Sequence, residues 1–128
     1  MNILANPGPF LLALLTLCPL AANAQDPTPF LGNWQARWES ERRPQEARVR
    51  ITETGGSWQT LASRRHQPCN GKEAPVALEK IGPETAILRL KFSEALAGCQ
   101  DGVVHLKRIT PNRMSGKRGE YEIEFTRD

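Results

Sequence analysis

No apolar run in this sequence is long enough to cross a bilayer as a helix. The longest one, residues 10–17, falls far short of the ~20 residues that a span needs. Blocks of about five or more like charges are absent as well, and the 17 basic and 14 acidic residues are interspersed to a net charge of +3, which excludes an arm that binds nucleic acid. Cys-x-x-Cys pairs are also lacking, which excludes a redox motif of that kind.

The first residues have the order of a signal peptide. The apolar stretch Phe10–Leu17 has the length of a signal-peptide core, and the triplet Ala22-Asn23-Ala24 has the small-x-small pattern at which signal peptidases cut. No Lys or Arg precedes the core, which departs from the usual pattern. We therefore predict a signal peptide over residues 1–24 and a single domain over residues 25–128, exported to the periplasm or secreted. The domain is long enough for one hydrophobic core.

The three cysteines divide into one that export removes and two that it retains. Cleavage after Ala24 removes Cys18 and leaves Cys69 and Cys99 in an oxidising compartment, which predicts one disulfide. On the chain-entropy model this loop closure stabilises the fold by about 3 to 4 kcal/mol. The alternative for Cys18 is lipidation, although Leu17 stands where a bacterial lipobox has Gly, Ala or Ser.

From Trp34 onward, short segments with two-residue alternation are separated by turn residues, and no segment keeps a helical period. The predicted strands cover about residues 33–38, 47–52, 57–64, 75–80, 86–93, a segment around Val104 and Leu106, and residues 113–117 and 120–126. Eight short strands joined by short connections are typical of a small all-β antiparallel up-and-down barrel, with a flattened sandwich as the alternative. In such a barrel the connections holding Cys69 and Cys99 lie at the same end.

The two ends of the domain resemble the calycin superfamily of lipocalins, avidins and fatty-acid-binding proteins. The residues that carry the resemblance are Gly32 and Trp34, a Gly-x-Trp at the first strand, and Arg127 just after the last one. The resemblance implies a barrel whose floor is closed by Arg127 packing across the ring of Trp34. For the other two tryptophans, Trp38 and Trp58, a position in the packed core is favoured over one that lines a ligand cavity.

The longer connections gather basic residues at one end of the predicted barrel, whereas the opposite end has only tight turns. Binding residues are commonly placed on longer loops of a rigid scaffold, so this rim is the candidate site for an anionic ligand or an acidic protein surface. The other interpretation is ordinary solubilising charge, balanced by Glu41, Glu46, Glu73 and Asp101. The candidate rim residues are Arg42, Arg43, Arg64, Arg65, His66, Asn70, Lys72, Lys117 and Arg118.

The residues point to a non-enzymatic binding module of the cell envelope. No nucleophile with a base is visible, and neither His66 nor His105 has a metal-spaced partner, so no catalytic residue, metal or cofactor is predicted. Glu120, Glu122 and Glu124 are interpreted as the solvent side of the last strand, beside Arg37 of the first. The alternative function is an inhibitor or immunity-type protein that blocks a secreted hydrolase with the loop Arg64–Lys72.

Overall fold

A computed structural model describes residues 26–61 and 68–128 of the chain. The predicted signal peptide, Cys18 and the predicted rim residues Arg64, Arg65 and His66 lie outside the described residues. None of the described helices is long and apolar enough to span a membrane.

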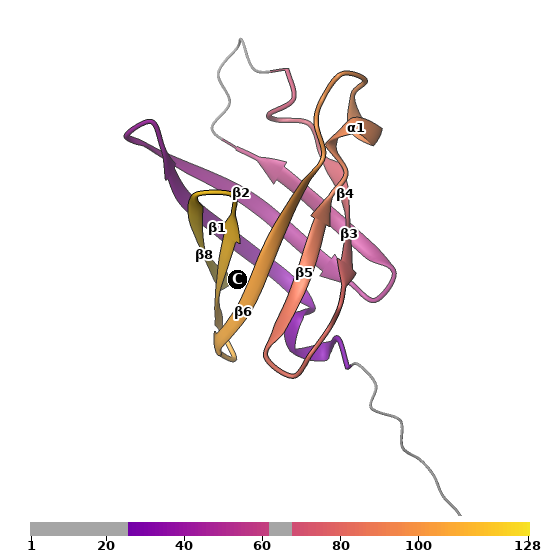
Figure 1. Ribbon diagram of the computed structural model, residues 1–128, viewed down its shortest axis with the longest axis vertical. Helices are drawn as coiled ribbons and strands as arrows, with labels where there is room; N and C mark the ends of the chain where they lie inside the picture. Colours follow the sequence, from indigo (N-terminus) through magenta and orange to yellow (C-terminus); the bar gives the residue numbers. More distant parts are fainter. Residues whose placement is uncertain (1–25, 62–67) are drawn as a thin grey trace, which may run out of the picture.

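The described chain forms a closed barrel of eight antiparallel strands in sequence order, so the predicted barrel is confirmed (Figure 1). The first and last strands close the wall through the register Trp34↔Arg127 to Arg37↔Glu124. The strands are β1 (Gly32–Ser40), β2 (Arg43–Thr52), β3 (Gly55–Thr60), β4 (Ala74–Glu79), β5 (Thr85–Leu90), β6 (Gly102–Thr110), β7 (Arg113–Arg118) and β8 (Tyr121–Arg127).

Several strand boundaries differ from the sequence prediction. β3 spans Gly55–Thr60 instead of about residues 57–64, and β1 extends to Ser40. β2 begins at Arg43 instead of residue 47, because Glu41 and Arg42 reverse the chain with φ of 53° and 65° and pairing resumes at once. Pro44 is tolerated in this strand because β3 pairs with β2 only from Ala47 onward. β5 ends at Leu90 instead of residue 93, and the short helix α1 (Phe92–Ala95) follows it (Figure 1).

Alternation places one face of every strand in a common core. Gly116 shows how closely this core is packed, since a Cβ there would lie 2.7 Å from Phe125 Cε1 and 2.7 Å from Val104 Cγ1. The buried apolar residues of the strands are Trp34, Ala36, Ala47, Val49, Ile51, Trp58, Ala74, Val76, Ala86, Leu88, Leu90, Val104, Leu106, Met114, Ile123 and Phe125.

One end of the barrel, which we call the floor, is closed by the cluster of Phe30, Trp34 and Arg127. Phe30 belongs to the 3₁₀ helix Thr28–Phe30 and is fully buried, and its carbonyl accepts the Trp34 Nε1–H at 3.0 Å. The Arg127 guanidinium lies 4.1 Å from the centroid of the Trp34 ring. Gly32, at φ 129°, leaves the space for it, since a Cβ there would lie 2.5 Å from Arg127 Nη1.

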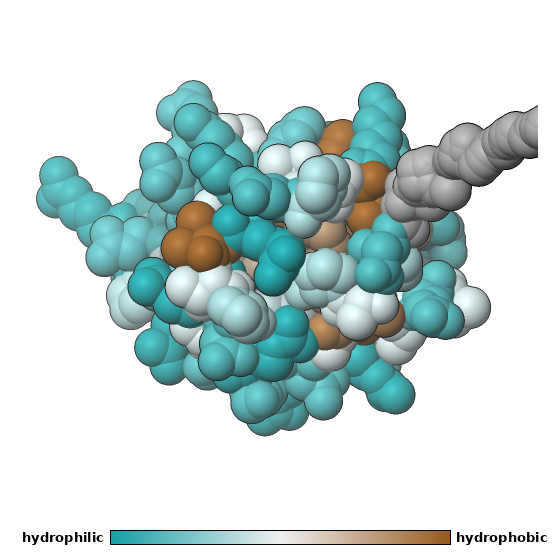
Figure 2. All heavy atoms as spheres, turned by 90° about the horizontal axis from the view of Figure 1, so that it is seen from below, coloured by the Kyte–Doolittle hydropathy of each residue, from teal (hydrophilic) through white to brown (hydrophobic). Residues whose placement is uncertain are grey.

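Three backbone carbonyls accept hydrogen bonds from Arg127. Its Nη1 donates to Leu31 O at 2.5 Å, its Nη2 to Pro29 O at 3.2 Å and its Nε to Pro111 O at 3.1 Å. These bonds tie the segment before β1 to the β6–β7 turn. Seen from this end, the surface is mainly hydrophilic, and its apolar residues form small separate patches (Figure 2).

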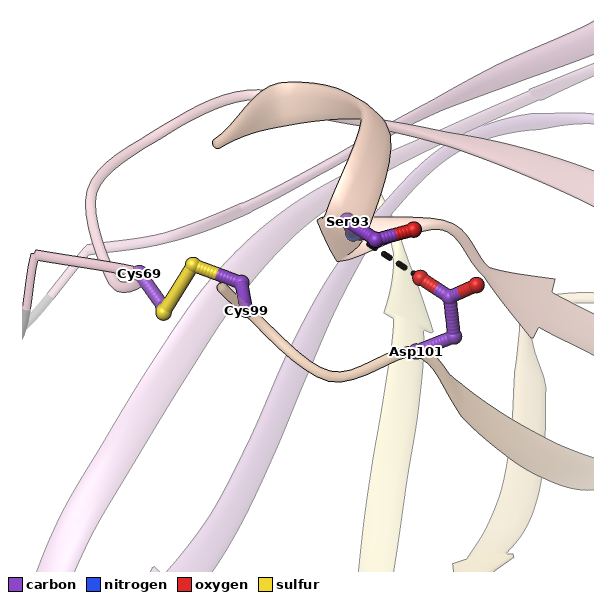
Figure 3. The surroundings of a disulfide bond; sticks show 4 residues. All are labelled: Cys69, Ser93, Cys99 and Asp101. Atoms are coloured by element: carbon purple, nitrogen blue, oxygen red, sulfur yellow. Dashed lines mark hydrogen bonds between the residues drawn. A yellow bond between two sulfur atoms is a disulfide. The ribbon is translucent and has the colours of Figure 1, made fainter. Parts of the chain in front are cut away.

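The opposite end, which we call the mouth, carries the disulfide. Cys69 follows β3 and Cys99 follows α1, with their Cα atoms 5.8 Å apart, so the predicted bridge is confirmed (Figure 3). Between α1 and β6 the chain is also held by Asp101, whose Oδ1 accepts the Ser93 backbone N–H at 2.8 Å. This hydrogen bond lowers the pKa of the Asp101 carboxyl below its ordinary value.

Candidate binding pocket at the barrel mouth

Towards the mouth, the inward-facing row of several strands changes from apolar to polar. On β7 the inward positions run Met114, Gly116, Arg118, and on β1 the row that begins with Trp34 ends at Trp38 and Ser40. The polar ends enclose a mouth pocket of about 1010 Å³. Its wall consists of Trp38, Ser40, Glu41, Arg43, Gln45, Thr60, Cys69, Asn70, Phe92, Gln100, Arg118, Gly119, Glu120, Tyr121 and Ile123.

Arg118 is the half-buried cation of this pocket. Its guanidinium lies 5.4 Å from the centroid of the Phe92 ring. Gly102 makes room for it, because a Cβ at that position would lie 2.9 Å from Arg118 Nε and 3.0 Å from Nη2. Burial lowers the pKa of Arg118, but a guanidinium stays protonated in proteins, so the group is a charge that has lost part of its hydration.

Within residues 26–61 and 68–128, the Arg118 side chain makes neither a hydrogen bond nor an ion pair. The ion pairs found in that part of the chain join Arg89 to Glu79 and Arg113 to Glu124, both on the outer surface. A charged group that gives up water ordinarily gains a partner, because an unpaired buried charge costs free energy. Arg118 is therefore available to an anion that enters the pocket.

The aromatic part of the pocket wall comes from β1, β8 and α1. Trp38 is half-buried and packs against the buried Trp58, with ring centroids 5.7 Å apart and planes tilted by 42°. Trp58 Nε1–H donates to Thr60 Oγ1 at 3.1 Å, so the buried indole is satisfied inside the barrel. Tyr121 is 44% exposed at the rim, where its hydroxyl accepts from Ser40 Oγ at 3.4 Å. Trp34 and Trp58 are thus core residues, whereas Trp38 also faces the pocket.

The predicted rim residues separate into those that line the pocket and those that do not. Arg43, Asn70 and Arg118 are part of its wall. Arg42 is exposed at the tip of the β1–β2 turn, outside that wall.

The other two described rim residues, Lys72 and Lys117, are exposed and do not line the pocket. Lys117 lies on the outer face of β7, opposite His105 and Glu122.

The three glutamates predicted on the solvent side of the last strand also differ in position. Glu122 and Glu124 are exposed on β8, but Glu120 precedes that strand and lines the pocket. Glu124 lies opposite Arg37 in the register, as expected, yet its ion pair is with Arg113. Arg37 instead donates to Gln35 Oε1 at 3.2 Å.

Sequence reasoning did not name as site residues the polar wall residues Ser40, Gln45, Thr60, Gln100 and Tyr121 or the aromatic Phe92. The alternation of the strands contained the information for four of the polar residues. Continuing the inward rows to the strand ends places Ser40, Gln45, Thr60 and Tyr121 at the mouth. Phe92 also continues the inward row of the predicted strand 86–93, although it belongs to α1. Gln100 could not be found in this way, because the segment between α1 and β6 has no strand period.

No family model, no curated protein and no solved structure matches this chain. Among the described residues, no group of three or more His, Cys, Asp or Glu side chains is arranged to hold a metal ion. The barrel and its mouth pocket are therefore the observations from which function is inferred.

Proposed function

We propose that this protein is an exported, non-enzymatic binding module of the cell envelope that takes a small anionic ligand in its mouth pocket. The observation that carries the proposal is Arg118, a half-buried guanidinium that lines the pocket and has no anionic partner among the described residues.

The binding free energy expected for an anion follows from the charge and the fixed position of the Arg118 guanidinium. Hydrogen bonds between ionised groups are about twice as strong as neutral ones, and the planar guanidinium accepts a carboxylate or phosphate in two parallel bonds. Phe92 fixes one face of the Arg118 group, and β7 fixes its backbone. A cation held in place before binding loses little conformational freedom when the ligand arrives.

The size of the pocket fits a small ligand. Ligand pockets commonly enclose about 300 to 1,000 Å³, and the mouth pocket, at about 1010 Å³, is just above the upper end of that range. Its two carboxylates, Glu41 and Glu120, are both exposed, whereas a general acid is ordinarily tuned by burial. This difference favours binding over acid–base catalysis.

The test is a thermal-shift and calorimetry screen of the oxidised mature protein against small carboxylates, phosphates, sulfates and neutral apolar compounds. At least one anion is expected to bind saturably, with an affinity that Arg118→Gln lowers about tenfold or more. Gly102→Ala displaces the guanidinium without removing its charge, so it should weaken binding too. Lys117→Gln, a loss of charge on the outer face of the same strand, should leave the affinity unchanged. Binding that survives Arg118→Gln, or no binding of any anion, contradicts the proposal.

Export is part of the proposal and has its own measurement. The disulfide favours an oxidising compartment. Mass spectrometry of the protein recovered after expression with residues 1–24 should find Gln25 at the amino terminus and Cys69 bridged to Cys99. A lipid on Cys18, or two free thiols, contradicts it.

A second candidate is an inhibitor or immunity-type protein, and the β1–β2 turn favours it. This turn projects beyond the neighbouring strands (Figure 1), and its two residues, Glu41 and Arg42, both hold positive φ and are exposed. A rigid projecting turn loses little entropy on entering a partner's active site. Pull-down from an envelope extract separates the candidates: a stoichiometric hydrolase released by Arg42→Ala supports the inhibitor.

A further inference from the structure

We infer that the ligand of the mouth pocket is an acidic saccharide, a sugar with one carboxylate that pairs with Arg118 and with a ring face that stacks on Trp38. The inference rests on the proposed function and names its ligand class. It follows from the charge, the polar groups and the aromatic surface of the pocket wall.

The charges of the wall favour a ligand with a single negative charge. Arg43 and Arg118 are balanced by Glu41 and Glu120, all four of which line the pocket. A diphosphate or other polyanion would bring repulsion from two carboxylates along with attraction to two guanidinium groups. A monoanionic carboxylate needs only Arg118, and its two oxygens fit the fork of the guanidinium.

The neutral polar groups of the wall call for a ligand with many hydroxyls. Gln45, Asn70 and Gln100 each offer both a donor and an acceptor, as does the hydroxyl of Ser40. A fatty-acid chain or a simple aromatic acid would remove water from these groups without replacing its hydrogen bonds, which costs free energy for each group. Sugar hydroxyls both donate and accept, so they can satisfy amides in either orientation.

The aromatic surface supplies the complementary apolar contact. Trp38 is half-buried and packs on Trp58, so its indole is held in one orientation while it borders the pocket. A pyranose ring has C–H bonds on its faces and hydroxyls around its edge. Because the face of an aromatic ring is electrically negative, it attracts the weakly positive C–H face. The wall thus combines a platform for a sugar face with polar groups for its edge.

The experiment compares matched probes by calorimetry on the oxidised mature protein. The probes are cellobiouronic acid, the neutral disaccharide cellobiose and the sugar-free carboxylate 3-phenylpropionate. We expect cellobiouronic acid to bind about tenfold or more tightly than either of the others. Arg118→Gln should reduce its affinity to the level of cellobiose, and Trp38→Leu should weaken both disaccharides equally. Lys117→Gln is the control and should change neither, and circular dichroism confirms that each variant keeps its barrel.

Each alternative result contradicts a particular claim. Equal binding of both disaccharides removes the role of the carboxylate and overturns the inference. Tighter binding of 3-phenylpropionate, dependent on Arg118, also overturns it but leaves an anion-binding pocket in place. If neither these probes nor any anion of the wider screen binds, the proposed function is overturned together with the inference.

Discussion

The barrel has an arginine over an aromatic ring at each end, and the two differ in what else they contact. At the floor, Arg127 lies 4.1 Å from the Trp34 ring and donates to three backbone carbonyls. At the mouth, Arg118 lies 5.4 Å from the Phe92 ring and makes no hydrogen bond or ion pair with the rest of the described chain. The first guanidinium is therefore used by the fold, whereas the second is unpaired within the described residues, as the proposed anion site requires.

The largest difference between the ends should appear on truncating their tryptophans. Trp34 is fully buried in the floor, so Trp34→Ala should lower the free energy of unfolding by about 3 to 5 kcal/mol. Trp38 is only half-buried and borders solvent in the mouth pocket, so Trp38→Ala should cost clearly less. Chemical denaturation of both variants measures this difference. Equal losses would mean that the mouth is as firmly packed as the floor.

Loss of the disulfide should loosen the mouth and spare the floor. Replacing both Cys69 and Cys99 by Ser should lower the free energy of unfolding by about 3 to 4 kcal/mol. Because Cys69 and Asn70 form one part of the pocket wall and Phe92 and Gln100 another, ligand affinity should fall as well. Hydrogen exchange locates the change: amides of the floor should keep their relative protection, whereas uniform deprotection would contradict a local effect.

The two arginines provide the direct test of the comparison. Arg127→Gln removes a cation that serves three carbonyls and should cost about 2 to 3 kcal/mol of unfolding free energy. Arg118→Gln removes a partly dehydrated charge that has no partner within residues 26–61 and 68–128, and it should change stability by less than about 0.5 kcal/mol. Urea denaturation measures both. A large loss of stability for Arg118→Gln would show that this residue serves the fold.

Backbone strain gives a smaller effect at both ends. Arg42 in the mouth and Lys80 in the β4–β5 turn at the floor end hold φ of 65° and 49° without being glycine. Arg42→Gly and Lys80→Gly should each raise stability by about 0.5 to 1 kcal/mol, since glycine adopts this conformation at no steric cost. Thermal denaturation checks the gain. Neither residue lines the mouth pocket, so ligand affinity should not change.

The smallest expected effect is on the loss of stability at low pH. Asp101 at the mouth accepts a hydrogen bond from the Ser93 backbone, and Asp26 at the floor accepts one from Thr28 N at 3.0 Å. Hydrogen bonds from the side chain and the backbone of Thr28 lower the pKa of the Asp26 carboxyl below 3.8, and the hydrogen bond from the Ser93 backbone lowers that of Asp101 in the same way. A lowered folded-state pKa stabilises the fold above the unfolded-state value, and this contribution disappears as the pH falls below about 3.8 through the folded-state value. Stability measured from pH 7 to pH 2 should therefore fall less steeply for Asp101→Asn and Asp26→Asn.

The sequence predicted the fold and only part of the site, and the reason lies in how far each pattern extends. Alternation along the strands, such as Ala86, Leu88 and Leu90, is repeated often enough to define the barrel and its inner face. The basic residues at the mouth could also be recognised in the sequence. The charge of a residue, however, does not show whether its side chain points into the pocket or away from it. Arg118 lines the pocket and its neighbour Lys117 does not, and the difference depends on where β7 pairs with β8.

The amino-acid sequence was sufficient to predict the number and order of the strands, the side that each turns to the core, and the end of the barrel at which the two cysteines meet. These properties follow from local periodicity and from chain order, which every antiparallel meander shares. Tertiary contacts decided which polar side chains face each other across the mouth and which guanidinium is unpaired among the described residues. Those contacts join residues far apart in the chain, such as Phe92 with Arg118 and Pro29 with Arg127, and no local pattern encodes them.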